Sequence, residues 1–312
     1  MNLLALLSLL LLVVPAYADT FGSGANQFDI DFTTIGNAGN VADDTGYGAV
    51  GYTYRIGTYE VSRGMIDAYN ALGGGPTLTM SDMTSYGGNG ADKPATGVSW
   101  NEAARFVNWL NTSNGYSAAY KFTTGGANDN IALWASGDAG YDPANPFRNS
   151  NAYYFLPSED EWYKAAFYDP DANGGSGGYW DYATGSDAVP TAVASGASGG
   201  TAVYDSQSGP ADIANAGGLS PYGTMAQNGN VWEWGESGAN APNDVGDELR
   251  VFRGGTWFSD SASLSFRNGL GPSGEGSAVG FRVASVPEPS ATLLTFLGAC
   301  GVIMRRRPIG SW

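Results

Sequence analysis

Apolar residues recur at helical spacing in several segments, and the first of these segments begins at a serine. Ser62 is followed by Met65, Ile66 and Tyr69, which share one face of a helix. A serine is a preferred N-terminal cap, and the three glycines at 73–75 are typical of a helix end. The pattern therefore predicts a helix between Ser62 and these glycines.

Two further serines begin capping boxes, in which a glutamate three residues later can bond back to the serine N–H. These pairs are Ser99 with Glu102 and Ser158 with Glu161. Each box precedes an apolar stripe: Ala103, Phe106, Val107 and Leu110 after the first, and Trp162, Ala165 and Ala166 after the second. We expect two more helices here.

The rest of the chain predicts short strands joined by long loops. Strand candidates are residues 52–56, 251–253 and 280–283, and the loops richest in Gly, Ser and Asn are 123–130, 173–178 and 194–200. No repeat and no long Pro-rich linker divides the chain. One α+β domain with many surface loops is therefore expected, although a split into two domains stays open.

Both ends of the chain are apolar and are typical of export signals. Residues 1–14 are rich in Leu, and Ala16 and Ala18 are small residues at the two specificity positions of a signal-peptidase site. The stretch lacks Lys and Arg before its apolar part, which departs from the usual pattern. We still predict a signal peptide at 1–18, cleaved by signal peptidase.

The C-terminal tail combines three features in a fixed order. Pro287, Glu288 and Pro289 precede the apolar run 291–304, and Arg305, Arg306 and Arg307 follow it. This order resembles the PEP-CTERM sorting signal of Gram-negative bacteria, assigned here to 286–307. The resemblance implies that an exosortase cuts near Pro287, with the arginines on the cytoplasmic side. A retained transmembrane helix is the alternative, although the run is shorter than the ~20 residues that a membrane-spanning helix needs.

The amino-acid composition excludes several classes of partner and of active site. Thirty acidic residues against fourteen basic ones give a net charge of −16, which disfavours nucleic acid as a partner. Histidine is absent, and the only cysteine, Cys300, lies in the apolar tail. These absences exclude zinc sites of Cys and His, nucleophile systems that need His, and disulfides in the body of the protein.

Eight segments occur in an order that is informative as a whole. They are residues 54–62, 94–104, 108–110, 154–162, 220–223, 229–234, 253–257 and 280–282. The series resembles the formylglycine-generating enzyme family, also called the sulfatase-modifying-factor domain, over 52–284, after an N-terminal extension at 19–51. The resemblance implies a single loop-rich α+β domain that is a variant of the C-type lectin fold. Within it, Arg253 and Arg282 are expected to pair with buried carboxylates such as Glu161 or Glu233.

The resemblance fails at the catalytic cysteines. In the family, two cysteines bind copper and activate oxygen, and the position of the first is Ser259 here. A serine hydroxyl does not replace a thiolate on Cu(I). We therefore expect no copper, no formylglycine-generating activity and no catalytic residue of the family type.

Calcium is a separate expectation from the same resemblance. The family holds a structural Ca²⁺ near residues 229–234, through carbonyls that correspond to Gly229 and Val231. The usual side-chain ligand falls at Ala226, so Asn228 or Asn230 would have to compensate. A loop without metal is the alternative.

Three hypotheses for function follow. The first is a non-catalytic binding or matrix protein, secreted or at the cell surface of a Gram-negative-type bacterium, whose loops bind a polysaccharide or a surface protein. The second is an enzyme of this family with altered chemistry, built on Ser259, Asp260 and Glu275, or a sulfatase-maturation accessory protein. The third is a purely structural surface protein.

Overall fold

The largest sheet of the computed structural model joins the two ends of its described chain, which comprises residues 17–240, 243–260 and 266–286. Its five antiparallel strands lie in the order β1 (Tyr17–Phe21), β2 (Phe28–Ile35), β3 (Tyr54–Gly57), β13 (Ala284–Ser285) and β4 (Tyr154–Phe155). The last strand thus lies between β3 and β4. The segment 19–51, which the sequence sets apart as an extension, contributes β2 and most of β1 to this sheet.

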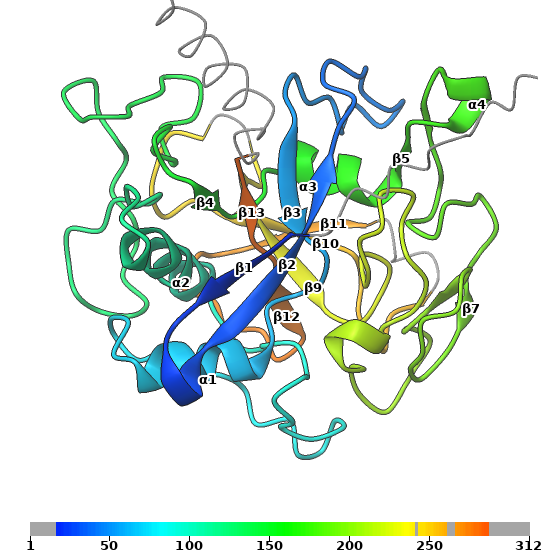
Figure 1. Cartoon of the computed structure of the whole chain (residues 1–312), viewed down its shortest axis with the longest axis horizontal. Coiled ribbons are helices and arrows are strands. Elements are labelled where there is room, and N and C mark those ends of the chain that lie inside the picture. The colour runs from blue at the N-terminus through cyan, green and yellow to red at the C-terminus, as the bar shows by residue number, and fades with distance from the viewer. Residues whose placement is uncertain (1–16, 241–242, 261–265, 287–312) are drawn as a thin grey trace, which may run out of the picture.

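A second sheet carries the tryptophan-rich motif. Its order is β11 (Arg267–Leu270), β10 (Arg250–Arg253), β9 (Trp232–Gly238) and β12 (Val279–Phe281), and only β12 and β9 run parallel. Two small ladders pair β5 (Tyr168–Asp169) with β6 (Gly178–Tyr179) and β7 (Thr191–Ala192) with β8 (Thr201–Ala202). In Figure 1 the larger sheets cross at the centre, and the loops around β7 lie at the right.

The three predicted helices and their caps are confirmed. They are α1 (Arg63–Ala71), α2 (Trp100–Ser113) and α3 (Glu159–Phe167). The Ser62 side chain accepts a hydrogen bond from the Met65 N–H, and both capping boxes are formed. The described chain also has the short helix α4 (Ala172–Gly175) and the 3₁₀ turns η1 (Gly24–Asn26) and η2 (Ile213–Asn215). The predicted loop 173–178 is therefore wrong in part, because α4 and β6 occupy it.

The apolar stripe of α2 forms the centre of the main core. Ala103, Phe106, Val107 and Leu110 are all fully buried. The Phe106 ring meets Phe281 of β12 edge-on, with their centroids 5.8 Å apart. Since β12 belongs to the second sheet, this contact fixes α2 against the strands that carry the motif. Figure 1 shows α1 and α2 together on the left of the sheets.

The predicted strands are displaced by one to three residues. The strand expected at 52–56 begins at Tyr54, and the one expected at 280–283 divides into β12 and β13 with Arg282 between them. None of the helices in the described ranges is long and apolar enough to cross a membrane. The predicted signal peptide, apart from Tyr17 and Ala18, and the predicted tail, apart from Val286, lie outside the described residues.

Candidate binding site

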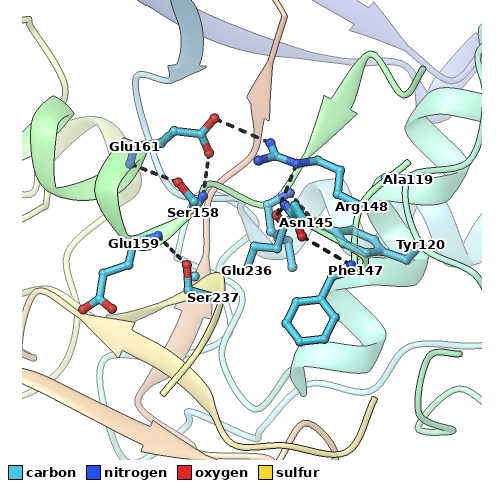
Figure 2. A network of polar contacts seen from close by, with 12 residues as sticks. Ala119, Tyr120, Asn145, Phe147, Arg148, Ser158, Glu159, Glu161, Glu236 and Ser237 are labelled. Carbon is cyan, nitrogen blue, oxygen red and sulfur yellow. Dashed lines mark hydrogen bonds and ion pairs between the residues drawn. The ribbon is translucent and has the colours of Figure 1, made fainter. Parts of the chain in front are cut away.

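A polar cleft of about 470 Å³ opens where the loop before β4 meets α3 and β9. The residues that define it chemically are Tyr52, Asn145, Arg148, Ser158, Glu236 and Ser237. They come from four separate parts of the chain, and the first turn of α3 and the end of β9 hold two of these parts rigidly. Figure 2 shows how most of these side chains converge.

One arginine bridges two buried glutamates in the wall of this cleft. Arg148 Nε lies 3.2 Å from Glu236 Oε1, and its Nη1 lies 3.5 Å from Glu161 Oε1. The guanidinium also covers the Phe155 ring at 4.0 Å from its centroid. Arg148 is 14% exposed, whereas the glutamate side chains are 0% and 2% exposed. The wall therefore holds one cation for two carboxylates.

Neutral groups donate hydrogen bonds to the oxygens of both carboxylates. Tyr52 Oη donates to Glu161 Oε1 at 2.7 Å, and the Ser158 N–H donates to Glu161 Oε2 at 2.6 Å. Tyr120 Oη donates to Glu236 Oε2 at 2.7 Å, and Asn145 Nδ2 donates to Glu236 Oε1 at 2.5 Å. All four carboxylate oxygens thus accept hydrogen bonds, as buried acceptors require.

Burial and neighbouring charges shift the pKa values of the groups in this network. It raises the pKa of Glu236, and Arg148 opposes this effect. Burial and the neighbouring carboxylates also raise the pKa values of Tyr52 and Tyr120, so both phenols remain donors at neutral pH. Burial lowers the pKa of Arg148, but the two glutamates raise it more, and the group stays a cation.

Two serine hydroxyls in the cleft keep a proton for an outside acceptor. Ser158 Oγ accepts from the Glu161 N–H at 3.2 Å, and Ser237 Oγ accepts from the Glu159 N–H at 3.0 Å. Within the described chain neither hydroxyl donates a hydrogen bond. The cleft thus offers hydroxyl donors beside charges that are already bound internally.

Ser259, at the position of the first family cysteine, forms hydrogen bonds within the turn that begins at Thr256. It is 9% exposed, its Oγ lies 2.9 Å from Thr256 Oγ1, and it accepts from the Thr256 N–H at 3.0 Å. The exposed Glu275 instead accepts from Asn128 Nδ2 at 2.7 Å. These two predicted residues of an altered active site therefore have separate partners, and neither lines the polar cleft.

The four residues predicted to hold calcium form the turn before β9. Asn228 Oδ1 accepts from the Ala183 N–H at 2.5 Å, and Asn230 Oδ1 accepts from the Ala211 N–H at 2.8 Å. Gly229 has φ of 94°, and a Cβ there would lie 2.2 Å from the Val203 carbonyl oxygen, so position 229 requires glycine. Val231 is the last residue of this turn.

Existing hydrogen bonds at this turn compete with a cation for the two asparagine oxygens. Both amide oxygens already accept N–H groups, which makes this donor set a poor fit for Ca²⁺ as it stands. In addition, the described residues contain no group of three or more acidic, His or Cys side chains arranged to hold a metal ion. Calcium at Asn228–Val231 stays a prediction.

Both arginines pair with buried carboxylates, as expected, but only one of the two glutamates named from the sequence is a partner. Arg282 pairs with Glu233 at 2.5 Å, but Arg253 pairs with Glu159 at 2.7 Å, not with Glu161. Glu161 is occupied because its capping box and Tyr52 bind its oxygens.

Sequence reasoning missed Arg148, Asn145 and Glu236, which form the centre of the cleft. The first two lie in the long segment between α2 and β4, where no periodic pattern marks them. The one available signal was Glu236, a carboxylate two residues beyond the second tryptophan of the motif. An acid in a buried strand requires a partner, which could have prompted a search for an arginine.

The sheets and caps define a loop-rich α+β domain with a curled sheet, consistent with the C-type lectin-like fold. The family model of the sulfatase-modifying factor enzyme 1-like domain matches residues 23–286, so the chain belongs to this family. No curated protein matches the chain.

Three solved structures share this fold. Variable protein 1 of Treponema denticola is 21% identical with a TM-score of 0.57, over 86% of this chain and 99% of its own. CarF is 22% identical with a TM-score of 0.57, over 83% and 99% of the two chains. PvdO from Pseudomonas aeruginosa is 17% identical with a TM-score of 0.51, over 86% and 98%. At these identities the likeness concerns the fold alone.

Proposed function

We propose that the chain is an exported, non-catalytic binding protein, and that its polar cleft binds a neutral sugar of a surface polysaccharide. The observation that carries this proposal is the composition of the cleft. Its charges are bound to one another inside the wall, while Ser158 and Ser237 keep hydroxyl protons for a ligand. Sugar hydroxyls are suitable acceptors for such groups.

The exposed aromatic side chain at the cleft supports a sugar over an ion. Tyr52 is 49% exposed, so part of its ring can contact the apolar face of a sugar ring. Glu161, Glu236 and Asp142 outnumber Arg148 around the cleft, which disfavours an anionic ligand. A neutral, oxygen-rich ligand is not repelled by these carboxylates.

The sequence supports the non-catalytic and exported parts of the proposal. Cys300 is the only cysteine, so the thiolate pair that binds copper in the family has no counterpart between the predicted export signals. The signals expected at 1–18 and 286–307 imply processing by signal peptidase and exosortase. Together they support a location outside the cell, where polysaccharides occur.

The test is glycan binding by the purified chain on an array of neutral and acidic glycans, followed by titration of the best ligand. Tyr52→Ala is expected to weaken binding at least tenfold, and Ser237→Ala severalfold. Tyr116→Ala is the matched control, since Tyr116 is a 43% exposed tyrosine that stacks on Tyr153 and does not line the cleft. Wild-type affinity in Tyr52→Ala, or an equal loss in Tyr116→Ala, would contradict the assignment.

A further inference from the structure

The polar cleft holds a further donor group besides the hydroxyls of Ser158 and Ser237. Asn243 lines the cleft, and its Oδ1 accepts from the Gly238 N–H at 2.8 Å. Its Nδ2 has no hydrogen-bond partner in the part of the chain that the structure describes. An amide nitrogen carries two hydrogens, so this side chain adds two donors to those of the serines.

Arg148 contributes a charged donor to the same cleft. Its Nε and Nη1 face Glu236 and Glu161, whereas its Nη2 has no partner among the described residues. The side chain is 14% exposed and lines the cleft. The two N–H groups on Nη2 are therefore left for an acceptor on a ligand.

The two acidic residues of the cleft lining leave little acceptor capacity. Both side-chain oxygens of Glu236 accept hydrogen bonds, from Asn145 and Tyr120. Asp142 Oδ1 accepts from the Ala144 N–H at 2.9 Å, which leaves Oδ2 without a partner in the described ranges. The cleft thus favours a ligand with a group that only accepts. A hydroxyl both donates and accepts, but an amide carbonyl is a pure acceptor.

An apolar wall adjoins these donors. Ala152, Phe155 and Val286 line the cleft, and Val286 is partly exposed and packs against the main core. The Arg148 guanidinium lies 4.0 Å from the centroid of the Phe155 ring, so the charged donor and the apolar wall are neighbours. A ligand group that joins a carbonyl oxygen to a methyl would match both, as is usual for pockets with few polar groups on an apolar lining.

We propose that the sugar bound in the polar cleft is a 2-acetamido sugar, such as an N-acetylhexosamine. The acetamido carbonyl accepts from Arg148 Nη2, and the acetamido methyl lies against Val286 and Phe155. Asp142 Oδ2 accepts the amide N–H or a hydroxyl of the sugar. This inference rests on the function proposed above, because it specifies which neutral sugar the same cleft binds.

The test compares three β-1,4-linked trimers by calorimetric titration of the purified full chain. Chitotriose carries acetamido groups, cellotriose has hydroxyls in their place, and the deacetylated chitosan trimer has ammonium groups. We expect chitotriose to bind at least tenfold more tightly than cellotriose, since a small apolar group in a matching pocket discriminates about 10–200-fold. The chitosan trimer should bind more weakly than chitotriose, because it lacks the carbonyl and the methyl.

Two variants test the two halves of the acetamido site. Val286→Thr replaces a methyl with a hydroxyl at the same volume and is expected to reduce the preference for chitotriose over cellotriose severalfold. Arg148→Lys keeps the charge but removes the Nη2 donors, and should also reduce this preference. Val189→Thr is the matched control, because Val189 is 54% exposed and does not line the cleft.

The outcomes separate this inference from the proposed function. Equal affinity for chitotriose and cellotriose would overturn the inference alone. It would also fail alone if no trimer binds while the glycan array identifies another neutral sugar, and both would fail if the array identifies no ligand.

Three further results would contradict the acetamido site. Tighter binding of the chitosan trimer would show attraction of a cation to the acidic surface. An unchanged preference in Val286→Thr, or an equal loss in Val189→Thr, would show that the methyl does not lie against Val286. If Arg148→Lys does not fold, the comparison of the trimers and the two Val variants still decide the matter.

Discussion

Arg282 and Arg148 are both buried arginines that contact glutamates, but the charges around them balance differently. Arg282 is 0% exposed and forms a fork with Glu233, with Nε–Oε2 and Nη2–Oε1 distances of 2.5 Å. It also donates to the carbonyls of Gly57 at 2.8 Å and Met225 at 2.7 Å. Arg282 therefore forms an ion pair with a single carboxylate, and its surplus N–H groups donate to backbone carbonyls.

Arg148 meets two carboxylates and faces a cleft. The distances to Glu161 and Glu236 are 3.5 Å and 3.2 Å, longer than those in the Arg282 pair. The difference separates two uses of buried charge. A saturated one-to-one pair fixes segments of the chain relative to one another, whereas an unbalanced group beside solvent leaves capacity for a ligand or a proton.

Lys164 is a third case, in which a cation has no carboxylate. It is fully buried at the end of α3, and its Nζ donates to the Asn37 carbonyl at 2.9 Å. Within the described part of the chain no carboxylate forms an ion pair with it. Burial accordingly lowers the pKa of Lys164 to about 8. The three cations form a series of one, two and no carboxylate partners.

The largest effect is expected for Arg282→Met. The substitution leaves Glu233 buried without its counter-ion, and removal of one partner of a buried pair lowers the free energy of unfolding by about 3–5 kcal/mol. Urea unfolding followed by tryptophan fluorescence would measure the change. The double variant Arg282→Met with Glu233→Gln should recover part of the loss, because the uncompensated charge is gone.

The matched control for this substitution is Arg105→Met. Arg105 donates to the carbonyls of Ala127 at 3.1 Å and Thr124 at 3.0 Å near the surface. Without a buried carboxylate to expose, the same change should cost less than about 1.5 kcal/mol. Similar losses in the two arginine variants would show that the pair with Glu233 is not special.

Arg148→Met should have a smaller effect that depends on pH. At neutral pH we expect a loss of about 2 kcal/mol, because two carboxylates lose a charged donor. The arginine opposes the raised pKa of Glu236, so its removal raises that pKa further. The folded variant then binds a proton that the unfolded chain releases as the pH rises above the ordinary value of 4.5.

The deficit of Arg148→Met relative to wild type should therefore be small near pH 4 and grow towards pH 7. Denaturant titrations of both proteins at several pH values would measure it. A deficit that is constant over this range would mean that the pKa of Glu236 does not respond to Arg148, and the contrast with Arg282 would then lose its electrostatic basis.

The saturated region could largely be predicted from sequence, and the unbalanced region could not. Caps such as Ser158 with Glu161 depend on neighbours within one turn, so local spacing is enough. For Arg282 the family resemblance offered Glu161 or Glu233 as partners, and the structure shows Glu233. Arg148 lies in a segment without periodicity, and its role depends on contacts with α3 and β9 that only the folded chain creates.

The smallest effect concerns Lys164, the cation without a carboxylate. Its pKa is about 8 in the folded chain against 10.5 ordinarily, so between these values the unfolded chain binds more protons and wild-type stability rises with pH. Lys164→Met lacks this titration. The free energy of unfolding of wild type relative to the variant should therefore increase by about 1–2 kcal/mol from pH 7 to pH 9. Because both proteins contain the same tyrosines, ionisation of those groups cancels in the difference. If the free energies of unfolding of the two proteins change equally with pH, Lys164 has no lowered pKa in solution. It would then not be a buried cation without a carboxylate partner.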